Sequence, residues 1–199
     1  MFACQELTVR ELNLLVKKHG GKKGVLRFLR QELSKSNRSW SEKAGVISFS
    51  VTSDGTSGRK WIKRLERKGF KVGVHAKSAL LSRQFKPTKG VTTNIKILKG
   101  EMWSDVRRTT KNILATAVKR KLTRPNAEVA CLIREMFSDI QLEAMGLRWV
   151  IVMHRFIKDV DGGPSALDIC SRDDGSWLRA NYIGSGRKWD RERGFAFAT

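Results

Sequence analysis

Apolar residues recur at helical spacing in the first part of the chain. Thr8 and Glu11 are placed as a capping box, which predicts a helix from there to about Lys18. The glycines of "HGGKKG" end this helix, and a second run of apolar positions predicts another over about 23–33. Residues 1–36 are therefore expected to form a helical hairpin joined by a glycine turn.

From residue 46 onward, strand-like apolar runs alternate with helical ones. The elements that these patterns predict are a strand at 46–51, a helix at 59–68, a short strand at 70–72, a helix at 76–85, a strand at 91–98, a long helix at 104–122 and a helix from Pro125 to Phe137. The first three suggest a β-α-β unit. Ser138 and Gln141 form a further capping box that opens a short helix.

The last fifty residues change character. "RWVIVMHRFI" is rich in β-branched and aromatic residues, and Asp174-Gly175 between two apolar runs is a strong hairpin signal. We expect an antiparallel β-meander of three or four strands over 147–199. The predicted fold class is α+β, in which the helical hairpin precedes a domain over 46–199 made of a basic mixed α/β middle and this meander.

The charged residues give the clearest indication of what the protein binds. The chain of 199 residues has 40 Lys and Arg against 19 Asp and Glu, a formal net charge of +21. From Arg59 to Arg124 there are 20 basic residues and three acidic ones. Because a solvated surface ordinarily mixes both signs, such an excess predicts a polyanionic partner, and nucleic acid is the main candidate.

The predicted helices at 59–68 and 104–124, with the lysines near the N-terminus, are expected to make most of the phosphate contacts. The candidate residues are Lys22, Lys23, Arg59, Lys60, Lys63, Arg64, Arg67, Lys68, Arg107, Arg108, Lys111, Lys119, Arg120, Lys121 and Arg124. Of the six tryptophans, Trp40, Trp103 and Trp189 lie in polar surroundings and are candidates for stacking on bases, whereas the other three are predicted to be core.

The stretch "SDGTSGRKW", residues 53–61, resembles a phosphate-binding loop in being a glycine-rich turn between a strand and a helix. It departs from the P-loop pattern because Trp61 stands where a Ser or Thr would bind magnesium. Two interpretations remain open, a bare turn with Ser57 capping the helix, and a turn whose helix start also contacts a backbone phosphate.

An enzyme acting on nucleic acid is the main alternative. His154 with Asp159, Asp161 and Asp168 could hold Mg²⁺ for phosphodiester hydrolysis, although "DVDGG" is also typical of a plain turn. No Cys or His pair has zinc-site spacing, so no cofactor is predicted outside this alternative. A third interpretation is a component of a larger ribonucleoprotein complex, with a protein partner beside the nucleic acid.

Two features of the sequence bear on the cellular location of the protein. No apolar run approaches the roughly 18 residues that cross a membrane, which predicts no membrane partner. Cys4, Cys131 and Cys170 are far apart and odd in number, so we expect a reduced, cytoplasmic protein.

Several stretches carry a resemblance to other sequences. From "SFSVTSDGTSG" through "GVTTNIKILKG", "RKLTRPNAEVACLIREMFSD", "EAMGLRWVIVMH" and "GGPSAL" to "GFAFAT", the chain resembles a group of uncharacterised bacterial hypothetical proteins. The resemblance covers the chain from Ile47 onward. It implies a bacterial cytoplasmic origin and no activity, ligand or site residue.

Overall fold

The computed structural model describes residues 9–18, 20–21, 23–24, 39–158 and 162–199, and the chain divides into two compact units, Met1–Arg38 and Ser39–Thr199. In the first unit, α1 (Val9–Lys18) forms where a helix is predicted. Gly20 and Gly21 follow with positive φ, and the Gly21 N–H donates to the Val16 carbonyl at 2.8 Å, which ends the helix. The predicted second helix lies almost wholly outside the described residues.

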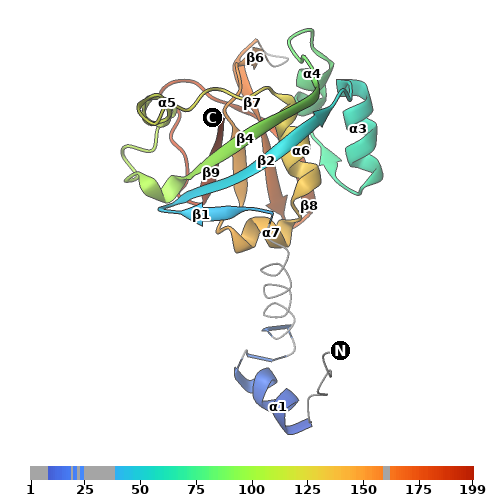
Figure 1. The fold of residues 1–199 in the computed structure, drawn as a ribbon, viewed down its shortest axis with the longest axis vertical. Coiled ribbons are helices and arrows are strands. Elements are labelled where there is room, and N and C mark those ends of the chain that lie inside the picture. The colour runs from blue at the N-terminus through green and yellow to red at the C-terminus, as the bar shows by residue number, and fades with distance from the viewer. Residues whose placement is uncertain (1–8, 19, 22, 25–38, 159–161) are drawn as a thin grey trace. The chain divides into compact units, whose positions relative to one another are not determined.

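The second unit is built on one mixed sheet, which has nine strands in the described residues (Figure 1). The strands are β1 (Ser41–Lys43), β2 (Val46–Asp54), β3 (Lys71–Val72), β4 (Lys89–Lys99), β5 (Trp149–Val152), β6 (Ile157–Lys158), β7 (Pro164–Arg172), β8 (Gly175–Tyr182) and β9 (Arg193–Ala198). Their order is β1-β2-β4-β9-β5-β7-β8-β3, with β6 paired to β7. Neighbours run antiparallel except for the pairs β5–β9 and β3–β8.

The C-terminal segment forms a meander only in part. The β7–β8 hairpin turns at Asp174-Gly175 as predicted, and β5 pairs antiparallel with β7. However, β9 leaves this group and lies between β4 and β5, parallel to β5. Its residues 194–198 are all buried, and a strand that is buried on both faces belongs in the middle of a sheet.

Two further predictions in the middle of the chain need correction. Strands β2 and β3 are not adjacent, because β3 pairs with β8 at the opposite end of the sheet, so they do not form a simple β-α-β unit. The helix predicted from Ser104 begins later, as α5 (Thr110–Lys119), after the 3-10 turn η1 (Gly100–Met102). Its N-cap is Thr109, whose hydroxyl accepts the N–H of Asn112 at 3.4 Å.

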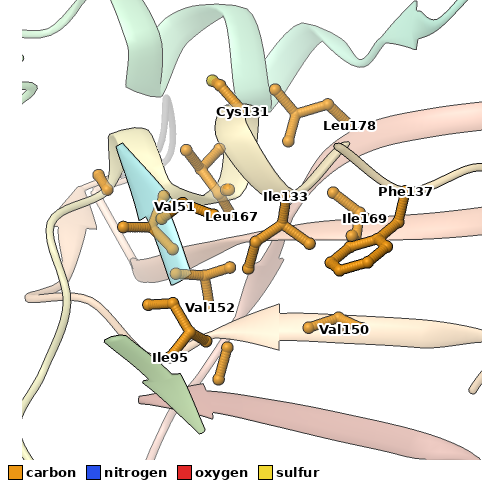
Figure 2. Close-up of a cluster of buried hydrophobic side chains, with 14 of the residues drawn as sticks. Val51, Ile95, Cys131, Ile133, Phe137, Val150, Val152, Leu167, Ile169 and Leu178 are labelled. Atoms are coloured by element: carbon orange, nitrogen blue, oxygen red, sulfur yellow. The ribbon is translucent and has the colours of Figure 1, made fainter. Parts of the chain in front are cut away.

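Helices cover both faces of the sheet. One face carries α3 (Gly58–Arg67), α4 (Val74–Leu81), α6 (Glu128–Met136) and α7 (Asp139–Ala144), and the other carries α5. Helix α6 packs against β2, β5, β7 and β8, which are spread along the sheet, so the sheet curves around it. Figure 2 shows Cys131 and Ile133 of α6 among strand residues such as Val152, Leu167 and Ile169. No helix in the described part of the chain is long and apolar enough to span a membrane.

Helices α3 and α4 approach so closely that the contact needs a glycine. A Cβ added at Gly58 would lie 1.8 Å from the carbonyl oxygen of Leu80, whereas one added at Gly186 would meet nothing within 4 Å. We expect Gly58→Ala to lower the free energy of unfolding by about 2–3 kcal/mol, because the backbone of α4 has to move. Gly186→Ala should stay within about 0.5 kcal/mol of the parent in urea unfolding. A Gly58→Ala protein of unchanged stability would contradict the close approach.

Candidate nucleic-acid interface

Helix α3 has one buried edge and one basic face. Trp61 and Leu65 are buried in the core that α3 shares with α4 and α6, which fixes the rotation of the helix. Lys60, Lys63 and Arg67 consequently face solvent, as does Arg59. The basic face of α3, as we use the term below, comprises Lys60, Lys63 and Arg67.

Arg64 of α3 and Lys68, its C-cap residue, are engaged within the protein. Glu135 of α6 accepts the Arg64 Nε at 2.7 Å and the Lys68 Nζ at 2.5 Å, and Arg64 also forms an ion pair with Asp54. Burial raises the pKa of Glu135, but the hydrogen bonds from Arg64 and Lys68 outweigh it and hold the pKa below its usual value. Arg64 and Lys68, both predicted to contact phosphate, therefore serve to attach α3 to α6.

The start of α3 presents unneutralised positive charge. Ser57 occupies the N-cap position, but its side chain makes no capping hydrogen bond, and the first turn contains no acidic residue. The preceding turn closes on itself, because the Thr56 N–H donates to Asp54 at 3.0 Å. Hydrogen bonds from Thr56 and then Arg64 lower the pKa of Asp54 to about 2. The Ser57 capping expected for a bare turn is absent, and a helix start of this kind is a competent anion site.

An open hollow joins this helix start to the basic face. Its volume is about 820 Å³, and its lining residues are Thr56, Lys60, Lys63, Arg64, Glu66 and Arg67. Glu66, its one acidic lining residue, is paired with Lys77 at 2.7 Å. The hollow therefore keeps a net positive charge that it can offer to a ligand.

A second group of cations lies around the end of the loop that follows α4. Lys89, the first residue of β4, packs beside Gly55 in the turn before α3, and Lys86 lies three residues earlier in the loop. Lys86, Arg124 and Arg155 line a hollow of about 460 Å³ that has no acidic residue in its lining. The Arg124 guanidinium stacks 4.4 Å from the ring centre of Phe156, and burial, reinforced by Arg155, lowers the pKa of Arg124.

The remaining predicted contacts divide between the opposite face and the first unit. Arg107, Lys111, Lys119, Arg120 and Lys121 are exposed on or beside α5, which the sheet separates from α3. Lys23 is exposed in the first unit, and Lys22 lies outside the described residues. The predicted residues thus form more than one surface.

Sequence reasoning missed several cations that the fold brings together. Arg120 lines a hollow of about 460 Å³ over β2 and β4 with Lys43 and Lys96, neither of which was predicted. Lys96 alternates with the buried Ile95 and Ile97 along β4 and donates to Ser48 at 2.7 Å. Period-two alternation was a signal that could have placed Lys96 on this face.

Arg108, predicted to contact phosphate, is instead buried. It is 4% exposed, and its guanidinium donates to the carbonyls of Gly100 and Trp103, both at 2.7 Å, and of Trp189 at 3.3 Å. A carboxylate oxygen of Asp105 lies 2.9 Å away. Arg108 holds the turns before α5 together and is removed from the candidate phosphate contacts.

His154, the central residue of the magnesium-site alternative, is engaged within the protein. His154 is buried, its Nε2 accepts the Leu167 N–H at 2.9 Å and its Nδ1 donates to the Arg155 carbonyl, so both ring nitrogens are engaged within the protein. Burial lowers its pKa to about 4. Asp159 and Asp161 lie outside the described residues. Across the part of the chain that the structure describes, no three His, Cys, Asp or Glu side chains gather as metal ligands would.

The tryptophans are distributed differently from the prediction. Trp40 and Trp189, candidates for base stacking, are buried, and the Trp189 Nε1 donates to Thr110 at 3.0 Å. Trp103 is half-buried against Phe195. Of the three predicted to be core, Trp61 is buried, whereas Trp149 and Trp177 are half-exposed on the sheet face opposite α3.

Comparisons with known proteins found no matching family model, no similar curated protein and no similar solved structure.

Two neighbouring arginines give a test of the assignments around α5. Arg108→Met would leave three backbone carbonyls without their donor, so we expect a loss of about 3–5 kcal/mol in the free energy of unfolding. Arg107→Met changes an exposed side chain and should alter stability by less than about 0.5 kcal/mol. Chemical denaturation of both variants measures the difference, and equal stabilities would show that Arg108 does not hold these turns.

Proposed function

We propose that this protein binds nucleic acid through contacts with the phosphate backbone, and that the basic face and N-terminus of α3 are the main contact surface. The observation that carries the proposal is that Lys60, Lys63 and Arg67 have no carboxylate partner among the described residues, although the helix that bears them is fixed by Glu135. Unneutralised cations on the exposed side of a helix that is anchored to the core are suited to a polyanion.

The spacing of these cations supports the proposal. Lys60, Lys63 and Arg67 follow one another at intervals of three and four residues, so they lie along one side of α3. With a rise of about 1.5 Å per residue they span about 10 Å, which equals about three base-pair steps along the axis of a duplex at about 3.4 Å each. The unneutralised start of the helix would add a further anion contact at one end.

Lys86, Lys89, Arg124 and Arg155 extend this surface. Lys89 lies beside Gly55 just before α3, and the other three surround the neighbouring hollow. A strand that leaves the start of α3 in this direction would continue over cations. Backbone contacts of this kind carry no base specificity, and the proposal assigns none.

The test is fluorescence anisotropy of labelled double-stranded DNA, single-stranded DNA and RNA across a salt series. Lys60→Gln/Lys63→Gln removes two of the proposed contacts from exposed positions without disturbing the Glu135 anchor. We expect about a tenfold or greater loss of affinity near 0.1 M salt and, for duplex DNA, a slope of log affinity against log salt that is smaller by about 2.

The matched control is Lys188→Gln/Arg191→Gln, which removes the same charge from exposed positions in the loop between β8 and β9. This protein should keep at least half of the parent affinity. If both double variants lose affinity equally, net charge rather than the α3 surface governs binding. If the parent binds none of the three probes at 50 mM salt, the proposed function is wrong.

A further inference from the structure

A cavity of about 710 Å³ opens on the face of the sheet opposite α3. Its volume lies within the range of small-molecule sites. The lining residues come from the ends of β5, β7 and β9, from β8 and from the loop between β8 and β9, and they are Arg148, Trp149, Arg172, Asp173, Asp174, Arg179, Asn181, Arg187 and Arg193. We call it the arginine cavity, because all five of its cations are arginines.

Strand register brings these residues together from distant parts of the chain. Trp149 of β5 lies between Arg193 of β9 and Cys170 of β7, and Arg179 of β8 is paired with Asp168 of β7. Adjacent strands of one sheet fix Trp149, Arg179 and Arg193, which form the floor of the cavity. Exposed side chains from the strand ends, the β7–β8 turn and the loop before β9 form its rim.

The arginines are incompletely neutralised. Arg193 is held by Asp190, 2.9 Å from its Nε, and it stacks 4.8 Å from the ring centre of Trp149. Arg179 and Arg187 have no carboxylate within ion-pair distance in the described residues. The lining also contains Asp173 and Asp174, so five arginines face two carboxylates and the cavity keeps a net positive charge, which favours an anionic occupant.

Asp168 is a buried carboxylate close to the arginines of the cavity. It is fully buried on the same side of the sheet as Arg179, with which it is paired in register. Burial raises its pKa to about 6, against the opposing effects of Arg179, Arg193 and the Asn181 side chain. A buried carboxylate beside these arginines neutralises only part of their charge.

The chemistry of the lining selects among anions. A guanidinium offers a planar pair of donors that matches phosphate oxygens, and a set of arginines without lysine indicates a phosphate held in a fixed orientation. A phosphomonoester carries about −1.5 to −2 at neutral pH, more than the single charge of a backbone diester, and suits several cations better. Arg148 and Arg193 lie 5.0 and 4.8 Å from the ring centre of Trp149, so this ring helps to hold two of the arginines at the cavity.

We propose that the arginine cavity binds a phosphomonoester group carried by a nucleotide, either free or at the end of a nucleic-acid strand. The proposal does not rest on strand binding by α3, because the sheet separates the two sites. A cavity of this size can enclose a phosphate at the end of a molecule. A phosphate in the middle of a strand is bonded on both sides, so the strand would have to enter and leave the same cavity.

The experiment measures binding to the full chain by titration calorimetry, with AMP, adenosine, and 5′-phosphorylated and 5′-hydroxyl forms of one dinucleotide as probes. We expect AMP to bind and adenosine to bind at least about 30-fold more weakly, because the arginines contact the phosphate. Binding of AMP alone identifies a free nucleotide as the ligand. Additional binding of the phosphorylated dinucleotide identifies a strand end. Equal binding of AMP and adenosine, or no binding of AMP, overturns the proposal.

Variants locate the binding. Arg179→Gln/Arg187→Gln should weaken AMP binding at least about 30-fold, and Arg187→Gln, in an exposed loop position, should weaken it about fivefold without affecting folding. The control Lys188→Gln/Arg191→Gln removes the same charge from the same loop but from outside the cavity lining, and it should change AMP affinity less than twofold. Equal losses in the cavity and control variants would overturn the assignment.

Asp168→Asn gives a result of the opposite sign. Removing the negative charge beneath the arginines at constant size should tighten AMP binding about three- to tenfold. A residue whose role is only structural would not do this, and weaker binding by the Asp168→Asn protein would show that the negative charge of Asp168 does not oppose anion binding. Lys60→Gln/Lys63→Gln separates the two proposals, since it should reduce strand binding by α3 while AMP affinity stays at the parent value.

Discussion

Helix α6 is the element on which the arrangement of the second unit depends. The sheet curves around it, and each of its charged side chains holds a different segment in place. Glu135 binds Arg64 of α3 and the C-cap residue Lys68. Glu128 accepts the backbone N–H of Thr88 in the loop after α4, and the fully buried Arg134 pairs with Asp139 at the start of α7. Because these hydrogen bonds involve charged or backbone groups that are largely shielded from water, they restrict the positions of the segments that they join. The position of α3, and of the basic face on it, therefore depends on α6.

The same contacts sort the basic residues into two kinds. Where a carboxylate from a distant segment reaches a cation, as Glu135 reaches Arg64 across 71 residues of sequence, the charge is used to fix the fold. Where none does among the described residues, as at Lys60 and Lys63, the cation is exposed to solvent without a counter-ion. Unpaired like charges on one surface repel each other and destabilise the folded state, and the phosphate contacts that we propose would relieve this repulsion.

Local structure could be read from the sequence, and long-range pairing could not. Helix α3 forms within one residue of its predicted bounds, the Ser138–Gln141 capping box is present, and the hairpin turns at Asp174-Gly175, since each depends on neighbouring residues. The position of β9 depends on strands about 100 and 40 residues earlier, and no local pattern records it. Arg108 was misassigned for a similar reason. A buried arginine and an exposed one in the same basic run have the same sequence pattern, and the carbonyl groups that bind Arg108 come from residues 100 and 189.

The arginine cavity shows why charge counting along the chain finds one kind of site and misses another. The α3 surface is built from consecutive turns of one helix, so its charge appears as a dense run in the sequence. The cavity draws its arginines from Arg148 to Arg193, a segment whose acidic residues nearly balance the basic ones, and only the register of β5, β7, β8 and β9 gathers them. A helix can present a row of cations to an extended polyanion, whereas adjacent strands can surround a single group from several sides. On our proposals the two faces of this sheet would hold anions of different form. Helix α6 packs on β5, β7 and β8 from one face, and the same strands carry lining residues of the cavity on the other, so one set of strand pairings positions both.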